Sequence, residues 1–300
     1  MRIGVDLGGS KIEIIVLGDD GDVLLRERVA TPQGDYAATL AAVAGLVVAA
    51  AEKVGAGDTA TPIGIGIPGA ESRVTGLVKN ANSTCLIGRP LKRDLEELLR
   101  REVRIANDAN CFALSEAVDG AGAGASVVFG VILGTGVGGG IVIDGKVLTG
   151  ANAIAGEWGH NPMPGEHHKD VCYCGRKGCI ELFLSGPGMG ADHRRSVGKL
   201  AGADFQAIDI AGHAANGDTQ CEATLQRYEA RLARALAQVI NILDPDVIVL
   251  GGGLSNMDRL YQNVPRLWGE YVFSDRVATR LLKHRHGDSS GVRGAAWLWS

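Results

Sequence analysis

Three cysteines and one histidine between residues 160 and 179 have the types and spacing of zinc ligands. They are His160, Cys172, Cys174 and Cys179, and glycines separate the last two cysteines. Three thiolates and one imidazole make the four ligands that tetrahedral zinc takes in a structural site. We therefore interpret this segment as a compact zinc knuckle without an open position for catalysis. Three thiols packed in a core are the alternative, and a disulfide is disfavoured in a reducing compartment.

A glycine turn near the N-terminus has the residues of a phosphate site. Gly8 and Gly9 separate two apolar runs, 2–7 and 12–17, which predicts strand, turn, strand. Glycines in such a turn let backbone N–H groups face a phosphate. Asp6 can hold Mg²⁺ through water, and Lys11 can contact phosphate; a plain hairpin is the alternative. The order Ser10-Lys11 and the strand that follows exclude a Walker A loop.

Two further glycine loops follow apolar runs. Residues 134–140 contain G-x-G-x-x-G, but the run 141–143 predicts a strand where a dinucleotide site needs a helix. We prefer a second phosphate hairpin, with the Thr135 hydroxyl as a donor. Gly251–Gly253 can let a purine approach the backbone, or can simply begin a helix. The predicted nucleotide contacts are Asp6, Gly8, Gly9, Ser10, Lys11, Gly134, Thr135, Gly136, Gly251, Gly252 and Gly253.

Asp108 lies between the predicted strand 103–106 and the predicted helix 109–118. It can be a helix N-cap, the ordinary role of aspartate there. It can also be the carboxylate that accepts the proton of an attacking hydroxyl in phosphoryl transfer. Asn80, Asn82 and Ser83 suit sugar hydroxyls, or form no more than a polar loop.

The elements that position these residues fall into two similar halves. Strand, glycine turn and strand occur near residue 6 and again near residue 136, which indicates two related α/β halves. Further strands are predicted at 63–67, 127–133 and 247–250. Helices are predicted at 35–54, 90–101, 222–243 and near the C-terminus, whereas 185–221 has no clear periodicity. For Cys85, Cys111 and Cys221 we expect packing roles alone.

Composition excludes several classes of protein. The chain has 300 residues, 46% of them hydrophobic, and a net charge of −4, so whole-chain disorder is excluded and nothing basic attracts nucleic acid or an acidic membrane. The 44 glycines have no three-residue period, which excludes collagen. The apolar stretch 40–51 is too short to span a bilayer and indicates a buried helix. No signal peptide is evident, so we expect a cytoplasmic protein.

Together these motifs resemble the ROK family of bacterial sugar kinases and repressors, over residue 2 to the end. The motifs are Asp6-Leu-Gly-Gly-Ser-Lys11, Asn107-Asp108-Ala-Asn110, the loop 133–140, Glu157-x-x-His160, Cys172-x-Cys-Gly-x-x-Gly-Cys-x-Glu181 and Gly251–Gly253. The fructokinase (manno-fructokinase) branch is the most similar. That likeness rests on 78–84, on 157–162 with Trp158, where the N-acetylglucosamine kinase branch usually has Phe, and on 286–299.

The resemblance implies the α/β actin-like ATPase (hexokinase-type) fold, with two α/β domains around a central cleft. The expected small domain is 1–117 plus 284–300, and the large domain, with the zinc knuckle, is 118–283. The resemblance implies ATP and Mg²⁺, Asp108 as general base, and zinc on His160, Cys172, Cys174 and Cys179. It also implies a homodimer. The implied sugar contacts, with Asn82 added from its polar loop, are Asn82, Asn107, Asp108, Glu157, His160 and Glu181.

We therefore expect an ATP-dependent hexokinase that converts D-fructose to D-fructose 6-phosphate. Another sugar of the family, N-acetylglucosamine, mannose or glucose, is the first alternative. A non-catalytic sugar-binding regulator is the second. Repressors of the family carry a winged helix before the first strand, and here that strand begins at Arg2, so we expect no nucleic-acid partner.

Overall fold

The computed structural model describes residues 1–55, 61–81, 83–166, 169–198 and 205–299. Contacts within the chain divide it into two compact units. Unit 1 comprises residues 1–124, 140–155 and 285–300, and unit 2 comprises 125–139 and 156–284. The domain bounds expected from the sequence stay a prediction.

The core of unit 1 is a five-stranded sheet of order β3-β2-β1-β4-β7. Its strands are β1 (Arg2–Leu7), β2 (Lys11–Leu17), β3 (Val23–Ala30), β4 (Ile63–Ile67) and β7 (Val103–Asn107). The first three are antiparallel neighbours, whereas β4 and β7 run parallel to β1. The carboxyl ends of β1, β4 and β7 therefore share one edge, which is where open α/β sheets place ligands. A small hairpin joins β5 (Ala70–Glu71) and β6 (Val78–Lys79).

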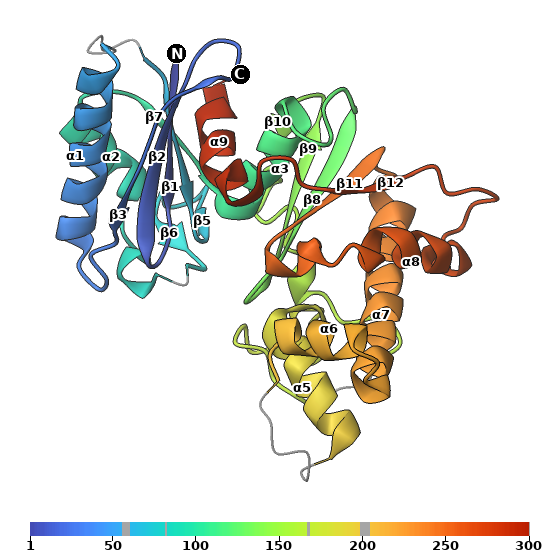
Figure 1. The fold of residues 1–300 in the computed structure, drawn as a ribbon. Coiled ribbons are helices and arrows are strands. Elements are labelled where there is room, and N and C mark those ends of the chain that lie inside the picture. Colours follow the sequence, from blue (N-terminus) through green and yellow to red (C-terminus); the bar gives the residue numbers. More distant parts are fainter. Residues whose placement is uncertain (56–60, 82, 167–168, 199–204, 300) are drawn as a thin grey trace. The chain divides into compact units, whose positions relative to one another are not determined.

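Helices cover both faces of this sheet (Figure 1). One face carries α1 (Tyr36–Lys53) and α2 (Leu91–Leu99), and the other carries α3 (Asp108–Val118) and α9 (Ser290–Ala296). Among the described residues, α1 alone has the length and the mean hydropathy, 1.4, of a membrane-crossing helix. Its buried face packs on the sheet through Val43, Leu46 and Val47, as in a core helix.

The second sheet has the order β10-β9-β8-β11-β12, and the boundary between the units falls within β9. Its strands are β8 (Val127–Leu133), β9 (Val137–Ile143), β10 (Lys146–Val147), β11 (Val247–Gly251) and β12 (Arg280–Lys283). The order matches that of the first sheet position by position, with β8 in the place of β1. The strands β9 and β10 lie on one side of β8, and the parallel strands β11 and β12 lie on the other. The predicted pair of related α/β halves is therefore confirmed.

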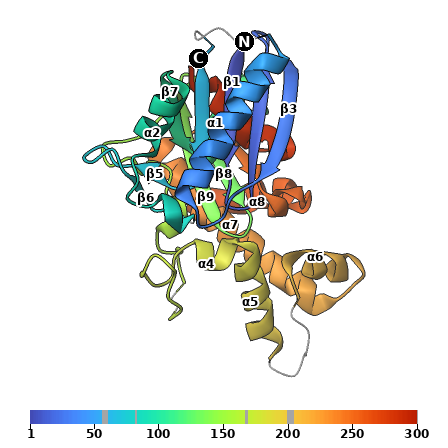
Figure 2. The same ribbon diagram turned by 90° about the vertical axis from the view of Figure 1, so that its left-hand side faces the viewer.

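Of the helices that the structure describes in unit 2, the sequence predicted α7 alone, as residues 222–243. The helices are α4 (Glu181–Leu184), α5 (Gly186–Val197), α6 (Ala207–Ala215), α7 (Thr219–Leu243) and α8 (Arg259–Leu267). Figure 2 shows α4, α5 and α6 grouped at one end of this unit. The unassigned stretch 185–221 thus contains α5 and α6. Short 3₁₀ helices lie at Thr84–Leu86, Trp158–His160, Gly253–Asn256, Trp268–Tyr271, Gly287–Ser289 and Trp297–Trp299.

One strand is longer than the sequence predicted. The expected strand 141–143 begins at Val137, inside the glycine run. A Cβ on Gly139 would lie 2.6 Å from the backbone oxygen of Gly156, so only glycine permits this close approach. The strand that follows the second glycine loop also excludes the dinucleotide fingerprint, as predicted.

Candidate functional site

The turn between β1 and β2 is held by the residues that follow β3. The Gly8 N–H donates to the Lys11 carbonyl over 3.0 Å. The Thr31 hydroxyl donates to the Gly8 carbonyl over 2.7 Å, and the Gln33 amide donates to the Gly9 carbonyl over 3.1 Å. Ser10 and Lys11 are exposed. The predicted strand–turn–strand is confirmed, and its contact with phosphate stays a prediction.

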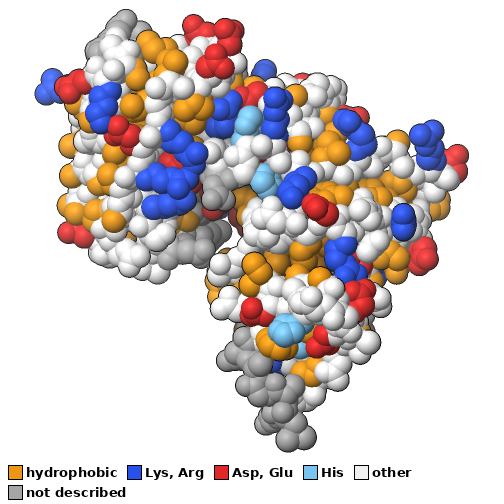
Figure 3. Space-filling model, in the orientation of Figure 1, with side chains coloured by type: hydrophobic (Ala, Val, Ile, Leu, Met, Phe, Trp, Pro, Cys, Tyr) orange, Lys and Arg blue, Asp and Glu red, His pale blue; other side chains and the backbone are white. Residues whose placement is uncertain are grey.

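A cationic group lies beside this turn and was missed by sequence reasoning. Glu13 of β2 is 1% exposed, and its two carboxylate oxygens accept from Arg26 over 2.5 Å and from Arg28 over 2.7 Å. Lys11 Nζ lies 3.8 Å from the same carboxylate. Figure 3 shows Lys and Arg side chains gathered on this face of unit 1. The signal in the sequence is the alternation of charges along two paired strands, since Glu13 lies opposite Arg28.

Asp6 lies at the edge where the parallel strands end, and the charge of Asp108 acts on it. Burial, followed by the negative charges of Asp108 and Glu13, raises the pKa of Asp6 to about 6, and Lys11 opposes this shift. Carboxylates are the ligands that Mg²⁺ prefers, and a bound cation relieves such repulsion. The donor set at this edge therefore fits Mg²⁺, with Asp6 as the residue that would hold it.

The start of α3 bears on the two roles that the sequence allowed for Asp108, helix N-cap and proton acceptor. Asn107 is the N-cap residue of this helix, and its carboxamide oxygen accepts from the Ala109 N–H over 2.9 Å. Asp108 is the first residue of the helix and is exposed, so the interpretation of Asp108 as the N-cap is corrected. The Asn107 amide nitrogen also donates to the Gly69 carbonyl over 3.0 Å. Asn82, another predicted sugar contact, lies outside the described residues.

The two glycine loops of unit 2 lie side by side. Gly134–Gly136 follows β8, and Gly251–Gly253 follows its parallel neighbour β11. Gly252 has a φ of 78°, and a Cβ on it would lie 2.4 Å from the Leu133 carbonyl oxygen. The N–H of Gly186 donates to the Gly134 carbonyl over 2.8 Å, so the start of α5 adjoins the same loops. Thr135 is exposed beside them.

The four predicted zinc ligands converge. Their ligand atoms all lie within 4.8 Å of one another in the part of unit 2 that the structure describes. His160 Nδ1 lies 3.6 Å from Cys172 Sγ, and Cys174 Sγ lies 3.6 Å from Cys179 Sγ. Tetrahedral zinc with bonds of about 2.0–2.3 Å separates its ligand atoms by roughly 3.5–3.8 Å. The residues therefore fit zinc, and Nδ1 is the nitrogen of His160 that faces the metal position.

Glu181 connects the zinc knuckle to the second glycine loop. It begins α4, and its carboxylate accepts from the Val137 N–H over 3.0 Å. The Cys172 thiol lies 3.8 Å from its other oxygen. The structure thus brings Glu181 and His160, two predicted sugar contacts, to the same knuckle, while Glu157 lies just before the 3₁₀ helix that ends at His160.

Tyr173, which the sequence analysis left without a role, joins this group. Its hydroxyl oxygen lies 3.0 Å from His160 Nε2, and the two rings pack edge to face. Partial burial of the hydroxyl, followed by the charges of Glu181 and Glu157, raises the pKa of Tyr173 to about 12. The sequence feature that could have singled out Tyr173 is its place between two predicted zinc ligands, Cys172 and Cys174.

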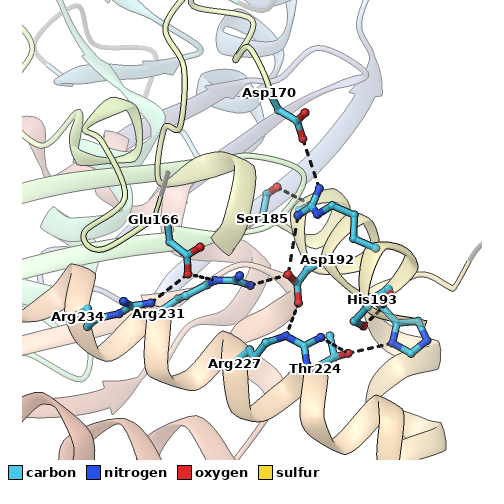
Figure 4. A network of polar contacts seen from close by, with 12 residues as sticks. Glu166, Asp170, Ser185, Asp192, His193, Thr224, Arg227, Arg231 and Arg234 are labelled. Carbon is cyan, nitrogen blue, oxygen red and sulfur yellow. Dashed lines mark hydrogen bonds and ion pairs between the residues drawn. The ribbon is translucent and has the colours of Figure 1, made fainter. Parts of the chain in front are cut away.

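An ion-pair network fixes the segment that leads into the knuckle (Figure 4). Glu166 accepts from Arg231 over 2.8 Å and from Arg234 over 3.1 Å, both on α7. Arg231 also lies 2.9 Å from Asp192 of α5, and its guanidinium stacks 5.1 Å from the ring centre of Phe183 in α4. Burial opposes ionisation of Asp192, but Arg231 and Arg227 hold its pKa below the ordinary value. One arginine thus ties three elements around the knuckle together.

Comparison with known proteins identifies the family. The model of the ROK family matches residues 2–300. This chain belongs to the ROK family. The ROK chain is 41% identical to an N-acetyl-D-glucosamine kinase of Vibrio cholerae, over 99% of both sequences.

Solved ROK structures resemble the chain along nearly its whole length. The ROK hexokinase of Thermus thermophilus superposes with a TM-score of 0.87 at 28% identity, over 99% of this chain and 97% of that one. A ROK family glucokinase of Streptomyces griseus, solved with glucose and AMPPNP, gives 0.76 at 28% identity, over 98% and 97%. The expected hexokinase-type fold and the resemblance to ROK sugar kinases are confirmed. The fructokinase branch is not confirmed, because these curated relatives are N-acetyl-D-glucosamine kinases.

Proposed function

We propose that this ROK chain is an ATP-dependent kinase that phosphorylates the 6-hydroxyl of N-acetyl-D-glucosamine. The identity of 41% to N-acetyl-D-glucosamine kinases, spread over 99% of the chain, is the observation that carries the choice of sugar. The paired carboxylates at the ends of β1 and β7 support the choice of reaction. The proposal therefore adopts the first alternative of the sequence analysis in place of fructose.

In the proposed mechanism Asp108 accepts the proton of the attacking hydroxyl. Its position as the first residue of α3 exposes its carboxylate while one oxygen accepts from the Ala109 N–H over 2.8 Å. The helix N-terminus favours the ionised form of a carboxylate, which is the form a base needs. Phosphoryl transfer requires little covalent help, so positioning this base is most of what the protein must do at the hydroxyl.

The glycine loops and charged groups would hold ATP. In unit 1 the turn Gly8–Ser10 with Lys11, and in unit 2 Gly134–Gly136 with the Thr135 hydroxyl, offer donors to phosphate oxygens. Gly251–Gly253 leaves its backbone open to a purine. Asp6 would hold Mg²⁺, which supplies positive charge to the triphosphate when bound. Asn107, Glu157, His160 and Glu181 would bind the sugar.

Fructose is the second candidate because Trp158 stands where the N-acetylglucosamine kinase branch usually has Phe. The indole of Trp158 is 5% exposed and packs edge to face on Phe129, 5.7 Å between ring centres. Its N–H lies 3.4 Å from the Gly138 carbonyl. Trp158 is a core residue, so its presence is weak evidence that the chain shares the sugar preference of the fructokinase branch.

A coupled assay of ADP release over a panel of sugars tests the proposal. We expect the highest kcat/KM for N-acetyl-D-glucosamine, with fructose, mannose and glucose each at least tenfold lower. A higher kcat/KM for fructose would restore the fructokinase interpretation. Tight binding of a sugar by calorimetry without ADP release would instead indicate a regulator.

We further propose that the knuckle holds structural zinc. Cys174→Ser removes one of four ligands and leaves the exposed loop otherwise unchanged. We expect the purified variant to lose its zinc, by mass spectrometry of the metal, and to bind sugar more weakly. Cys85→Ser is the matched control and should keep full zinc. Equal zinc in Cys174→Ser and the wild type would refute the ligand set.

A further inference from the structure

Three cationic side chains of unit 1, the cationic row, begin beside the phosphate turn, and the proposed mechanism uses only the first. Lys11 begins β2 directly after the turn, and Arg28 and Arg26 belong to the neighbouring strand β3. Lys11 pairs with Ala30, and Glu13 pairs with Arg28. Because alternate residues of a strand point to the same side, the row and Glu13 share one face of the sheet. Arg28 is two residues, about 7 Å along the strand, from Ala30 beside the turn.

A buried carboxylate fixes the two guanidinium groups of the row. Glu13 is 1% exposed, and its two oxygens accept from the Nε of Arg26 over 2.5 Å and from the Nε of Arg28 over 2.7 Å. A guanidinium has several N–H donors, and only one of them is on Nε. Among the described residues, Glu13 is the only acceptor that the structure gives either guanidinium. The Nη donors of both arginines therefore lie side by side, held in place and without a protein acceptor in that part of the chain.

The row carries more positive charge than Glu13 balances. Lys11 Nζ lies 3.8 Å from the same carboxylate, so three cations surround one buried anion. The three cationic side chains are 35–45% exposed, so a solute can reach them. Asp6, opposite Glu13 on β1, is a further acidic group on this face, and it is the residue that would hold Mg²⁺. Cations this close repel one another, so the row favours an anionic ligand.

Phosphate is the anion that these donors suit best. An arginine binds phosphate oxygens through two parallel N–H donors, and a lysine adds a point charge. The Thr31 N–H donates to the Ser10 carbonyl over 3.1 Å, so the end of β3 is fastened to the turn that we assign to the triphosphate. A phosphate chain that reaches this turn therefore meets the row at its end.

We propose that the Nη groups of Arg28 and Arg26, together with Lys11, form a binding site for the terminal group of a phosphate chain. ATP is the chain that the proposed function supplies, and a free inorganic triphosphate has the same chemistry. The inference deepens the proposed function and rests on it in one respect, because it presumes that the turn Gly8–Ser10 binds phosphate. It gives two arginines that the mechanism does not use a role in holding the phosphoryl donor.

Arg28→Gln tests the site by binding measurements that need no turnover. With Mg²⁺ and without sugar, titration calorimetry should give a Kd about tenfold above that of the wild type for ATP and for inorganic triphosphate, because a charge-assisted contact is lost. The Kd of AMP, which lacks the outer phosphates, and the Kd of N-acetyl-D-glucosamine should stay within twofold. The loss should shrink as salt rises from about 0.05 M to about 0.5 M, because exposed charges are screened.

Lys53→Gln is the matched control. Lys53 pairs over 2.6 Å with Glu27, which lies on the same strand as the two arginines but points to the other face of the sheet. This variant should match the wild type in every titration. Arg28→Lys keeps the charge and loses the fork, so it should recover part of the affinity. Should Arg28→Gln fail to fold because Glu13 is left with too few partners, Glu13→Gln/Arg28→Gln removes the stranded charge and takes its place.

The two phosphate ligands distinguish the sources of the phosphate. A loss for ATP, with or without triphosphate, supports a site for the end of the donor, and a loss for triphosphate alone supports a site for free phosphate beside the nucleotide. Unchanged Kd values for both ligands, or an equal loss for AMP, would overturn the inference. A wild-type enzyme that releases no ADP with N-acetyl-D-glucosamine would refute the proposed function instead, and the binding results would still decide the inference.

Discussion

Asn107 and Asp108 share a single donor, the backbone N–H of Ala109. The carboxamide oxygen of Asn107 lies 2.9 Å from this nitrogen, and a carboxylate oxygen of Asp108 lies 2.8 Å from it. Because Asn107 already caps α3, the helix does not depend on the charge of Asp108 for its first turn. The cap of α3 by Asn107 is therefore compatible with the role of general base that we propose for Asp108.

Asp108→Asn should therefore separate activity from stability. The amide keeps an oxygen that can accept from Ala109 but cannot take a proton, so we expect kcat to fall by about 10²–10⁴. The thermal unfolding midpoint should stay within about 2 °C, since a surface change of this kind alters stability little. Steady-state ADP release and a thermal melt measure the two effects. Asp20→Asn, in the exposed turn after β2, is the control, and near-full kcat in Asp108→Asn would contradict the assignment.

Asp6→Asn should stabilise the fold at neutral pH while it lowers activity. The pKa of Asp6 is raised to about 6, so the folded chain holds a proton there that the unfolded chain has lost above pH 3.8. The free energy of unfolding of the wild type therefore falls as pH rises from about 4 to 6. By pH 7 the difference amounts to about 2–3 kcal/mol, which the amide variant avoids.

Urea unfolding of Asp6→Asn and the wild type at pH 4.5 and pH 7 without Mg²⁺ tests the sign. The variant should be the more stable by about 2–3 kcal/mol at pH 7 and by only about 1 kcal/mol at pH 4.5, where the folded wild type still holds the proton on Asp6. If the difference in the free energy of unfolding between variant and wild type does not change with pH, the surroundings of Asp6 do not disfavour its ionised form.

The strands and the zinc knuckle were predictable because their signals are local. The runs 63–67 and 127–133 are apolar and bounded by Pro68 and Gly134, and the structure has strands over the same residues. The zinc ligands fall within one short segment, so their spacing alone brought them together. The helix α5 was not predictable, because its first turns read Gly-Pro-Gly-Met-Gly. It forms because Ser185 caps it and its residues Gly188 and Met189 are buried.

The supporting contacts of the site were not predictable, since they join residues far apart in the chain. Glu166 and Arg231 are separated by 65 positions, and no pattern in the sequence selects that arginine from the others of α7. Arg26 and Arg28 differ in that charges alternate along their strand, but this pattern selects Glu13 as their partner only once the register of β2 and β3 is known. Sequence motifs thus identified the candidate site residues, whereas the side chains that hold those residues in place were found only in the structure.

Arg231→Met should lower the free energy of unfolding of unit 2, because one guanidinium serves two carboxylates. The guanidinium is 11% exposed and serves both Glu166 and Asp192, so its removal leaves two partly buried carboxylates with fewer partners. We expect a loss of about 2–4 kcal/mol in the free energy of unfolding, near the lower part of the range for breaking a buried pair. Urea unfolding followed by tryptophan fluorescence measures it.

Arg195→Met is the matched control for this network. Arg195 is 41% exposed and lies 3.4 Å from Asp170 and 3.9 Å from Asp192. Exposed pairs contribute between nothing and about 1 kcal/mol, so this variant should lose less than that amount. Similar losses in the two variants would show that Arg231 is one surface charge among several.

Gly252→Ala should damage the loop that we assign to the purine. The residue has a φ of 78°, which an alanine adopts only at a cost of about 1–2 kcal/mol, and its Cβ would lie 2.4 Å from the Leu133 carbonyl oxygen. The chain must move at the end of β8, next to Gly134. We therefore expect a lower thermal midpoint and a KM for ATP raised several-fold, with the KM for the sugar little changed. The next residue supplies the control, because a Cβ on Gly253 meets nothing within 4 Å and requires no left-handed backbone. Gly253→Ala should thus keep the wild-type midpoint, and an equal loss of stability in both variants would show that the approach of Gly252 to Leu133 is not what fixes this loop.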